Sequence, residues 1–315
     1  MVELIVSGVL ALHLLCVNVA AAAPLICLWC EWREARGNSL AGELGRFLAK
    51  SAVVLFCVGM LLGLLVGALL WSEKYSAVLS YLSSKVLFGV AELGFSLVLL
   101  AIYIPWWKRF TTCSTGHRLG RAMLPFLAGT NLMYHFPILF VIISNLMQLE
   151  TTPKHALDAA GFRQLMMDGE VMARVVHFWL ASFAVTGGLI MWRAWRLMRA
   201  QSDNPKASSL ALWGGRIAAA PTILQLPIGI WLVLELPGAV QNEFTGGSIL
   251  TSSLFAASLL AALWLMHQLL AVAFGSIQPR SLVLAMLSMI VVVVLMTGTL
   301  RATKTSRSLS QFVEE

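Results

Sequence analysis

Long apolar runs recur along the whole chain, and polar residues are confined to short stretches between them. The runs are continuously apolar and do not alternate with period two, which indicates helices and not barrel strands. Each run is long enough to cross the hydrocarbon core of a bilayer, which takes roughly 20 helical residues. We predict eight such helices, over residues 4–30, 47–71, 77–106, 121–147, 171–195, 208–236, 248–275 and 280–301.

Composition strengthens this interpretation. Hydrophobic residues make up 59% of the chain and charged residues only 12%, and the mean hydropathy is +0.82. A soluble chain of 315 residues has too little interior to hide that much apolar surface, so we predict an all-α integral membrane protein. The start, MVEL, lacks the basic segment of a cleaved signal, and we interpret the first run as a retained helix.

Lysine and arginine are distributed unevenly between the connections. Those after the first, third and fifth helices are basic, and they carry Arg33, Arg36, Arg46 and Lys50; Lys108, Arg109, Arg118 and Arg121; and Arg193, Arg196, Arg199 and Lys206. The alternate connections carry at most two each. Basic loops face the cytoplasm, so the N-terminus is expected outside. The net charge of +7 mostly reflects these loops, and no nucleic-acid partner is expected.

Few ionisable residues lie inside the predicted helices, where function is most often found. They are His13, Lys85, Glu92, His135, Arg174, His177 and His267. Counted along their helices, His13, His135 and His177 lie within ~6 Å of one level in the outer leaflet. Such a layer of imidazoles suits redox centres near the outer surface.

His177 has the most suggestive surroundings. Small residues surround it at helical spacing, at Ala173, Ala181, Ala184 and Gly188. An axial histidine needs uncrowded surface for the flat haem, and Arg174 is placed to meet a haem propionate. The alternative is ordinary helix packing through small residues, with Arg174 paired to Glu170.

The other polar residues leave more alternatives open. His13 has fewer small residues around it than His177 does. His135 and His267 have no such small-residue surroundings, and we interpret them as histidines that pack between helices. Glu92 lies near mid-membrane, and it has several candidate roles: a structural hydrogen bond, a salt bridge to Lys85, a proton relay or a haem-iron ligand. The motif Cys27-x-x-Cys30 lacks the histidine of a c-type haem site, and we interpret its cysteines as small hydrophobic residues.

Five helices in the same order resemble subunit I of the cytochrome bd quinol oxidases. The matching stretches are LHLLCVNVAAAAPLICLWCEWREARG, RFLAKSAVVLFCVGMLLGLL, GVAELGFSLVLLAIYIPWWKR, TNLMYHFPILFVIISNLMQ and GEVMARVVHFWLASFAVTGG. The last is the best match, with a basic residue three before a histidine, then small residues and V-T-G. The resemblance divides the chain into a similar region, 1–200, and a divergent three-helix region, 201–315.

The resemblance implies haem b, in one or more copies. His13 falls on the family's high-spin haem ligand, His177 on the low-spin haem ligand and Arg174 on the basic residue before it. The departures are that only one glutamate, Glu92, stands where the family has two, the quinol loop is reduced to 237–248, and the ninth helix is missing. The low-spin haem's methionine has no obvious counterpart; His135, Met289 and Met296 are substitutes.

We therefore expect a haem-b cytochrome of the bacterial inner membrane that carries electrons near the outer face within a complex of membrane subunits. A quinone and a cytochrome c-type protein are both open as electron donors, and oxygen reduction would use Glu92 for protons. One alternative is a scaffold or anchor subunit that keeps the fold without cofactors. A transporter that uses Lys85 and Glu92 has less support, because we see no inverted repeat.

Overall fold

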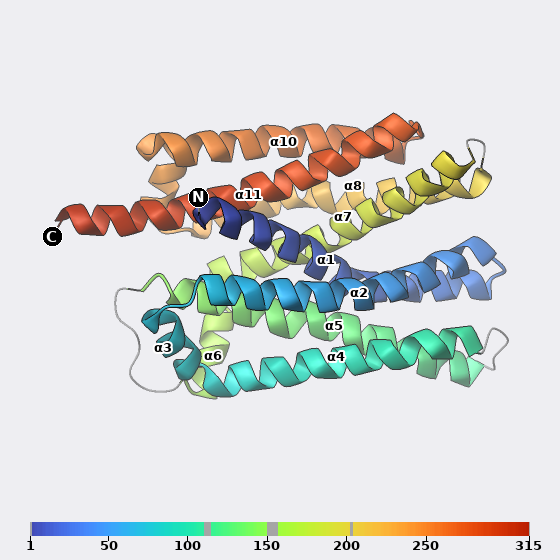
Figure 1. Cartoon of the computed structure of the whole chain (residues 1–315), viewed down its shortest axis with the longest axis horizontal. Helices are drawn as coiled ribbons and strands as arrows, with labels where there is room; N and C mark the ends of the chain where they lie inside the picture. Colours follow the sequence, from blue (N-terminus) through green and yellow to red (C-terminus); the bar gives the residue numbers. More distant parts are fainter. Residues whose placement is uncertain (1, 110–114, 150–156, 202–203, 315) are drawn as a thin grey trace. The chain divides into compact units, whose positions relative to one another are not determined.

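The computed structural model describes residues 2–109, 115–149, 157–201 and 204–314, and these ranges contain helices and no strand. Eight helices are long and apolar enough to cross a membrane, which confirms the predicted multi-pass all-α architecture. They are α1 (Val2–Ala35), α2 (Ser39–Leu69), α4 (Ser83–Arg109), α5 (Thr115–Leu146), α7 (Gly169–Ala200), α8 (Pro205–Glu235), α10 (Ile249–Ala273) and α11 (Pro279–Glu314) (Figure 1). Short helices α3 (Glu73–Tyr81), α6 (Ala159–Met166) and α9 (Gly238–Asn242), with the π-helical turn η1 (Glu243–Gly247), lie between them.

The predicted helix over 77–106 was wrong in one respect, because the structure interrupts it at Leu82 and separates α3 from α4. Hydroxyl side chains crowd this point. Ser80 Oγ donates to the Ser76 carbonyl at 3.0 Å, a bond that bends helices, and two more serines begin α4. The short α3 begins with Ser72, whose hydroxyl accepts from the Tyr75 N–H.

The helices group into two compact units, which we describe separately. The first unit covers Cys16–Phe183, and the second combines Met1–Leu15 with Ala184–Glu315. In the first unit α4 packs against α5 and α2, and in the second α10 packs against α11 and α8. The division of the sequence at residue 200 came from the resemblance and stays a prediction.

The first unit places the early part of α7 alongside α5 in antiparallel direction. Trp179 Nε1 donates to the Met133 carbonyl at 2.6 Å, and Arg174 Nη1 donates to Asn145 Oδ1 at 3.3 Å. A core between these bonds holds the two helices together, with Ile138, Ile142, Leu146, Val171 and Val175 buried in it. This packing fixes the side of α7 that carries His177.

The second unit uses small residues for close helix packing. A Cβ on Gly187 of α7 would lie 2.6 Å from the Gly214 carbonyl oxygen of α8, so the two backbones touch. The next residue, Gly188, receives the side chain of Met289 from α11, since a Cβ there would lie 2.8 Å from the Met289 sulfur. Ser258 and Thr299 join α10 to α11 through a hydroxyl contact of 3.3 Å.

Candidate functional site

One face of α7 in the first unit carries the predicted haem residues. Arg174, His177, Phe178 and Ala181 follow one another at helical spacing, and all four are partly exposed. The flanking positions Ala173, Val175 and Ser182 are buried. His177 therefore lies among partly exposed residues of this helix while its Nδ1 atom is buried, with a cation one turn before it and a methyl group one turn after it.

Arg174 is held in place by two side chains. Its Nη2 atom lies 2.5 Å from Glu170 Oε1 in an i, i+4 ion pair, and its Nη1 atom donates to Asn145 of α5. This is the pairing with Glu170 that we weighed against a haem role. The Arg174 side chain keeps 20% of its surface exposed, so its guanidinium is oriented without being enclosed.

His135 of α5 packs against aromatic side chains. Its ring centre is 5.6 Å from that of Phe88 on α4 and 5.0 Å from that of its neighbour Tyr134. On the same side of α5, Asn131 Nδ2 donates to the Glu92 carbonyl at 3.0 Å and to Ser96 Oγ at 2.8 Å. These contacts are those of a histidine that packs against α4. Packing was the alternative to a role of His135 as haem ligand.

Glu92 and Lys85 form no ion pair in the part of the chain that the structure describes. The Lys85 ammonium lies 5.4 Å from the ring centre of Phe162, a cation–π contact with α6. The Glu92 side chain is partly exposed on α4, and only its backbone carbonyl is tied to α5. Its salt bridge to Lys85 was thus the wrong alternative, and its proton or ligand role stays a prediction.

His13 belongs to the second unit and His177 to the first, so each is described in its own surroundings. The His13 side chain is buried in α1. In the same unit, Met289 packs on Gly188, one of the small positions that follow His177 along α7. At Gly188 the lack of a side chain therefore serves helix packing, and Met289 is engaged there.

Within the described ranges, no group of three or more His, Cys, Asp or Glu side chains is placed to hold a metal ion. A haem makes no such demand, because its porphyrin supplies four nitrogen ligands and the protein adds one or two. The donor set that matters is a single histidine with open surface beside it. His177 lies on a helix face of partly exposed residues, and its own Nδ1 atom is buried.

A second polar site, which sequence reasoning missed, lies where α1, α2, α4 and α5 meet in the first unit. We call it the ionic cluster; its members are Glu31, Glu34, Arg46, Tyr103, Trp107 and Arg121. The Glu31 carboxylate accepts from Tyr103 Oη at 2.7 Å and from Arg121 Nε and Nη2 at 3.1 and 3.0 Å. Each side chain of the Glu31–Arg121 pair is only 7% exposed.

The rest of the ionic cluster surrounds Trp107. Glu34 accepts from Trp107 Nε1 at 2.7 Å and from Arg46 Nη1 at 2.7 Å. The guanidinium carbons of Arg46 and Arg121 lie 5.9 and 5.6 Å from the centre of the Trp107 ring. The ring fits because α2 has a glycine opposite it; a Cβ on Gly45 would collide with its edge. The signal available in the sequence was a set of two glutamates and two arginines, with a glycine beside one of them: Glu31, Glu34, Arg46, Arg121 and Gly45.

Comparison with known proteins bears on the fold. No protein-family model and no curated protein matches the sequence. Among solved structures, a chain from the bd oxidase of Geobacillus thermodenitrificans is similar, with a TM-score of 0.73 and 12% sequence identity. The match covers 96% of this chain and 84% of that chain. The protein thus has the membrane fold of a bd oxidase subunit, as the resemblance of its helices indicated.

Proposed function

We propose that this chain is a haem-b membrane cytochrome of the bd-oxidase subunit I type. The observation that carries the proposal is the partly open face of α7, on which His177 follows Arg174 by one turn. The fold supports it, since a chain of a bd oxidase is similar over 96% of this chain with a TM-score of 0.73. Its place is the bacterial inner membrane, with the N-terminus outside as the loop charges predict.

The residues on this face suit a haem. His177 offers an imidazole nitrogen as axial ligand, and the small side chain of Ala181, one turn further along, suits the edge of a flat ring. Arg174 is oriented by Asn145 and Glu170, and its remaining exposed surface can take a propionate carboxylate through charge-assisted hydrogen bonds. Bound haem would supply one-electron chemistry at this level of the membrane.

The remaining assignments rest on the family resemblance. His13 is the proposed ligand of a second, high-spin haem, and Glu92 the group that delivers protons if oxygen is reduced there. His135 is retained only as a sixth-ligand candidate for the His177 haem. The chain would work with other membrane subunits and receive electrons from a quinone or a cytochrome c-type protein.

A reduced-minus-oxidised visible spectrum with haem quantitation tests the proposal on the purified full chain. We expect at least one b-type haem, and we expect His177→Ala to abolish the low-spin signal. His267→Ala is the matched control, since it removes an imidazole that packs against Trp264 and has no proposed haem role. His13→Ala should remove a high-spin signal alone. A colourless wild-type protein, or an unchanged spectrum in His177→Ala, would contradict the proposal.

The alternative function is a scaffold subunit without cofactors. Two observations favour it: Arg174 already has Glu170 as a partner, and Met289 fills the space beside Gly188. In that case the protein is colourless, and His177→Ala and His135→Ala lower its melting temperature by similar amounts. The same spectrum and a melting curve therefore separate the two functions.

A further inference from the structure

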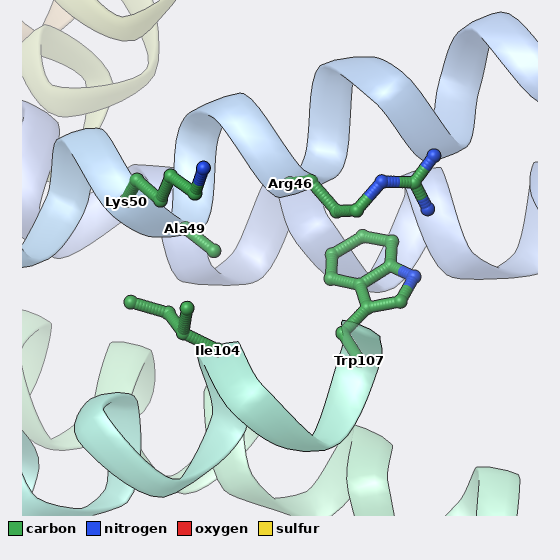
Figure 2. Close-up of a pocket in the computed structure, with 5 residues that line it drawn as sticks. All are labelled: Arg46, Ala49, Lys50, Ile104 and Trp107. Atoms are coloured by element: carbon green, nitrogen blue, oxygen red, sulfur yellow. The ribbon is translucent and has the colours of Figure 1, made fainter. Parts of the chain in front are cut away.

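A small hollow lies between α2 and α4, beside the ionic cluster. It is lined by Arg46, Ala49, Lys50, Ile104 and Trp107. Figure 2 shows Arg46 above the Trp107 ring at one end and Lys50 over the other end, with Ile104 facing α2 from below. The hollow thus combines two cations with an aromatic ring and two aliphatic side chains.

The two cations of the hollow are not equivalent. Arg46 is largely neutralised by Glu34, whose carboxylate lies 2.7 Å away. Lys50, one turn further along α2, is exposed and makes no ion pair or hydrogen bond with any residue that the structure describes. The hollow therefore carries an excess positive charge, which suits a monoanionic group such as a phosphodiester.

The floor of the hollow is rigid and apolar. Trp107 is buried, and its ring is fixed by the hydrogen bond to Glu34 on one side and the close approach of Gly45 on the other. Ala49 is buried beside it, and Ile104 is partly buried. A ligand that fits here has an anionic head next to an apolar part.

The surface beyond Lys50 shows where the apolar part of such a ligand would run. On the same face of α2 follow Val54 and Leu61, which are 60% and 68% exposed. Exposed aliphatic residues on a membrane-spanning helix face lipid tails. The cationic end of this stripe lies at the basic connections, where tryptophan and lysine side chains meet the headgroups.

We infer that this hollow binds an anionic phospholipid, with the phosphate between Lys50 and Arg46 and an acyl chain along α2. The occupant is a lipid and not a free phosphate ester, because the cations adjoin an exposed apolar stripe and not an enclosed polar pocket. The site is separate from the proposed haem site and does not depend on it.

Native mass spectrometry of the full chain in detergent, with added lipids, tests the inference. Phosphatidylglycerol, phosphatidylcholine of the same acyl chains, and glycerol phosphate are added in separate titrations. We expect one phosphatidylglycerol to bind about fivefold more tightly than phosphatidylcholine, since one lysine near anionic headgroups supplies roughly that factor. Lys50→Gln should abolish the difference, and Lys50→Arg should restore it.

Arg199→Gln is the matched control, because Arg199 is also an exposed cation at a basic connection beside a tryptophan, 5.2 Å from the ring centre of Trp195. It should leave the preference for phosphatidylglycerol unchanged. Equal binding of the two lipids, or the same loss in Arg199→Gln as in Lys50→Gln, would overturn the inference. Displacement of phosphatidylglycerol by glycerol phosphate at similar concentration would overturn it too, in favour of a free phosphate ester.

Discussion

Two polar regions of the first unit differ in how completely the protein satisfies them. In the ionic cluster, both carboxylates are bound by cations and by ring or hydroxyl donors, and the central pair is buried. On the α7 face, a histidine and an arginine belong to partly exposed positions, and the arginine is bound by Glu170 of its own helix and by Asn145 of α5. Both regions place charge in or near a membrane.

This difference indicates which region stabilises the structure and which region is expected to bind a ligand. Burying charges is costly, so a cluster in which every charge has a partner stabilises the contact between helices but has little capacity left for a ligand. The α7 face, with an imidazole and an oriented cation among partly exposed residues, is the region that we expect to keep that capacity. The prediction is that variants of the ionic cluster change stability, whereas variants of the α7 face change what the protein binds.

The largest expected effect is that of Arg121→Met. It leaves the buried Glu31 carboxylate without its cation, and removal of one partner from a buried pair costs about 3–5 kcal/mol. The melting temperature in detergent should fall strongly, along with the yield of monodisperse protein. Haem per folded molecule should not change.

The double variant Glu31→Gln/Arg121→Met is the control for that experiment. It removes both charges together and should recover much of the lost stability, because no uncompensated charge stays buried. A double variant as unstable as Arg121→Met alone would mean that packing, and not charge, holds the cluster together.

Gly45→Ala should have the next largest effect. Its new methyl group would collide with the Trp107 ring, and overpacking of this kind costs about 1–3 kcal/mol. Gly94→Ala in α4 is the matched control, since nothing lies within 4 Å of a Cβ there and alanine favours a helix. Thermal melting should therefore fall for Gly45→Ala and stay level or rise for Gly94→Ala.

The sequence predicted the membrane helices well because their signal is local. A run of some twenty apolar residues has one stable arrangement in lipid, so eight spans were found, although some of their ends differ by five to eight residues. The break at Leu82 was missed because hydropathy alone counts this run as continuous. It does not register the serines that interrupt the helix there.

The ionic cluster could not be predicted in the same way. Glu31 and Arg121 are ninety residues apart, and both lie where the predicted helices end, so Arg121 counted only as an orientation signal. The helices in fact continue through these ends, which turns loop charges into partners between helices. Contacts of this kind depend on tertiary packing, which periodicity does not encode.

Trp179→Phe offers a smaller test of how α7 is positioned. It removes the hydrogen bond from Nε1 to the Met133 carbonyl and keeps most of the ring, so the expected loss is about 0.5–1.5 kcal/mol. If α7 holds His177 in place for a haem, the low-spin band should also broaden or shift. A loss of stability with an unchanged spectrum would show that the bond supports packing alone.

The smallest stability effect is expected for the Glu170–Arg174 pair, and it decides what Arg174 does. An i, i+4 pair on a partly exposed helix face contributes about 0.3–0.5 kcal/mol, so Glu170→Gln and Arg174→Gln should melt within a degree or two of the wild type. Their haem content should differ. An arginine that serves only Glu170 would make the two variants equivalent, whereas an arginine that holds a propionate would make Arg174→Gln alone lose haem during purification. Haem per protein, measured for both variants after the same washes, distinguishes an ion pair within one helix from a ligand contact.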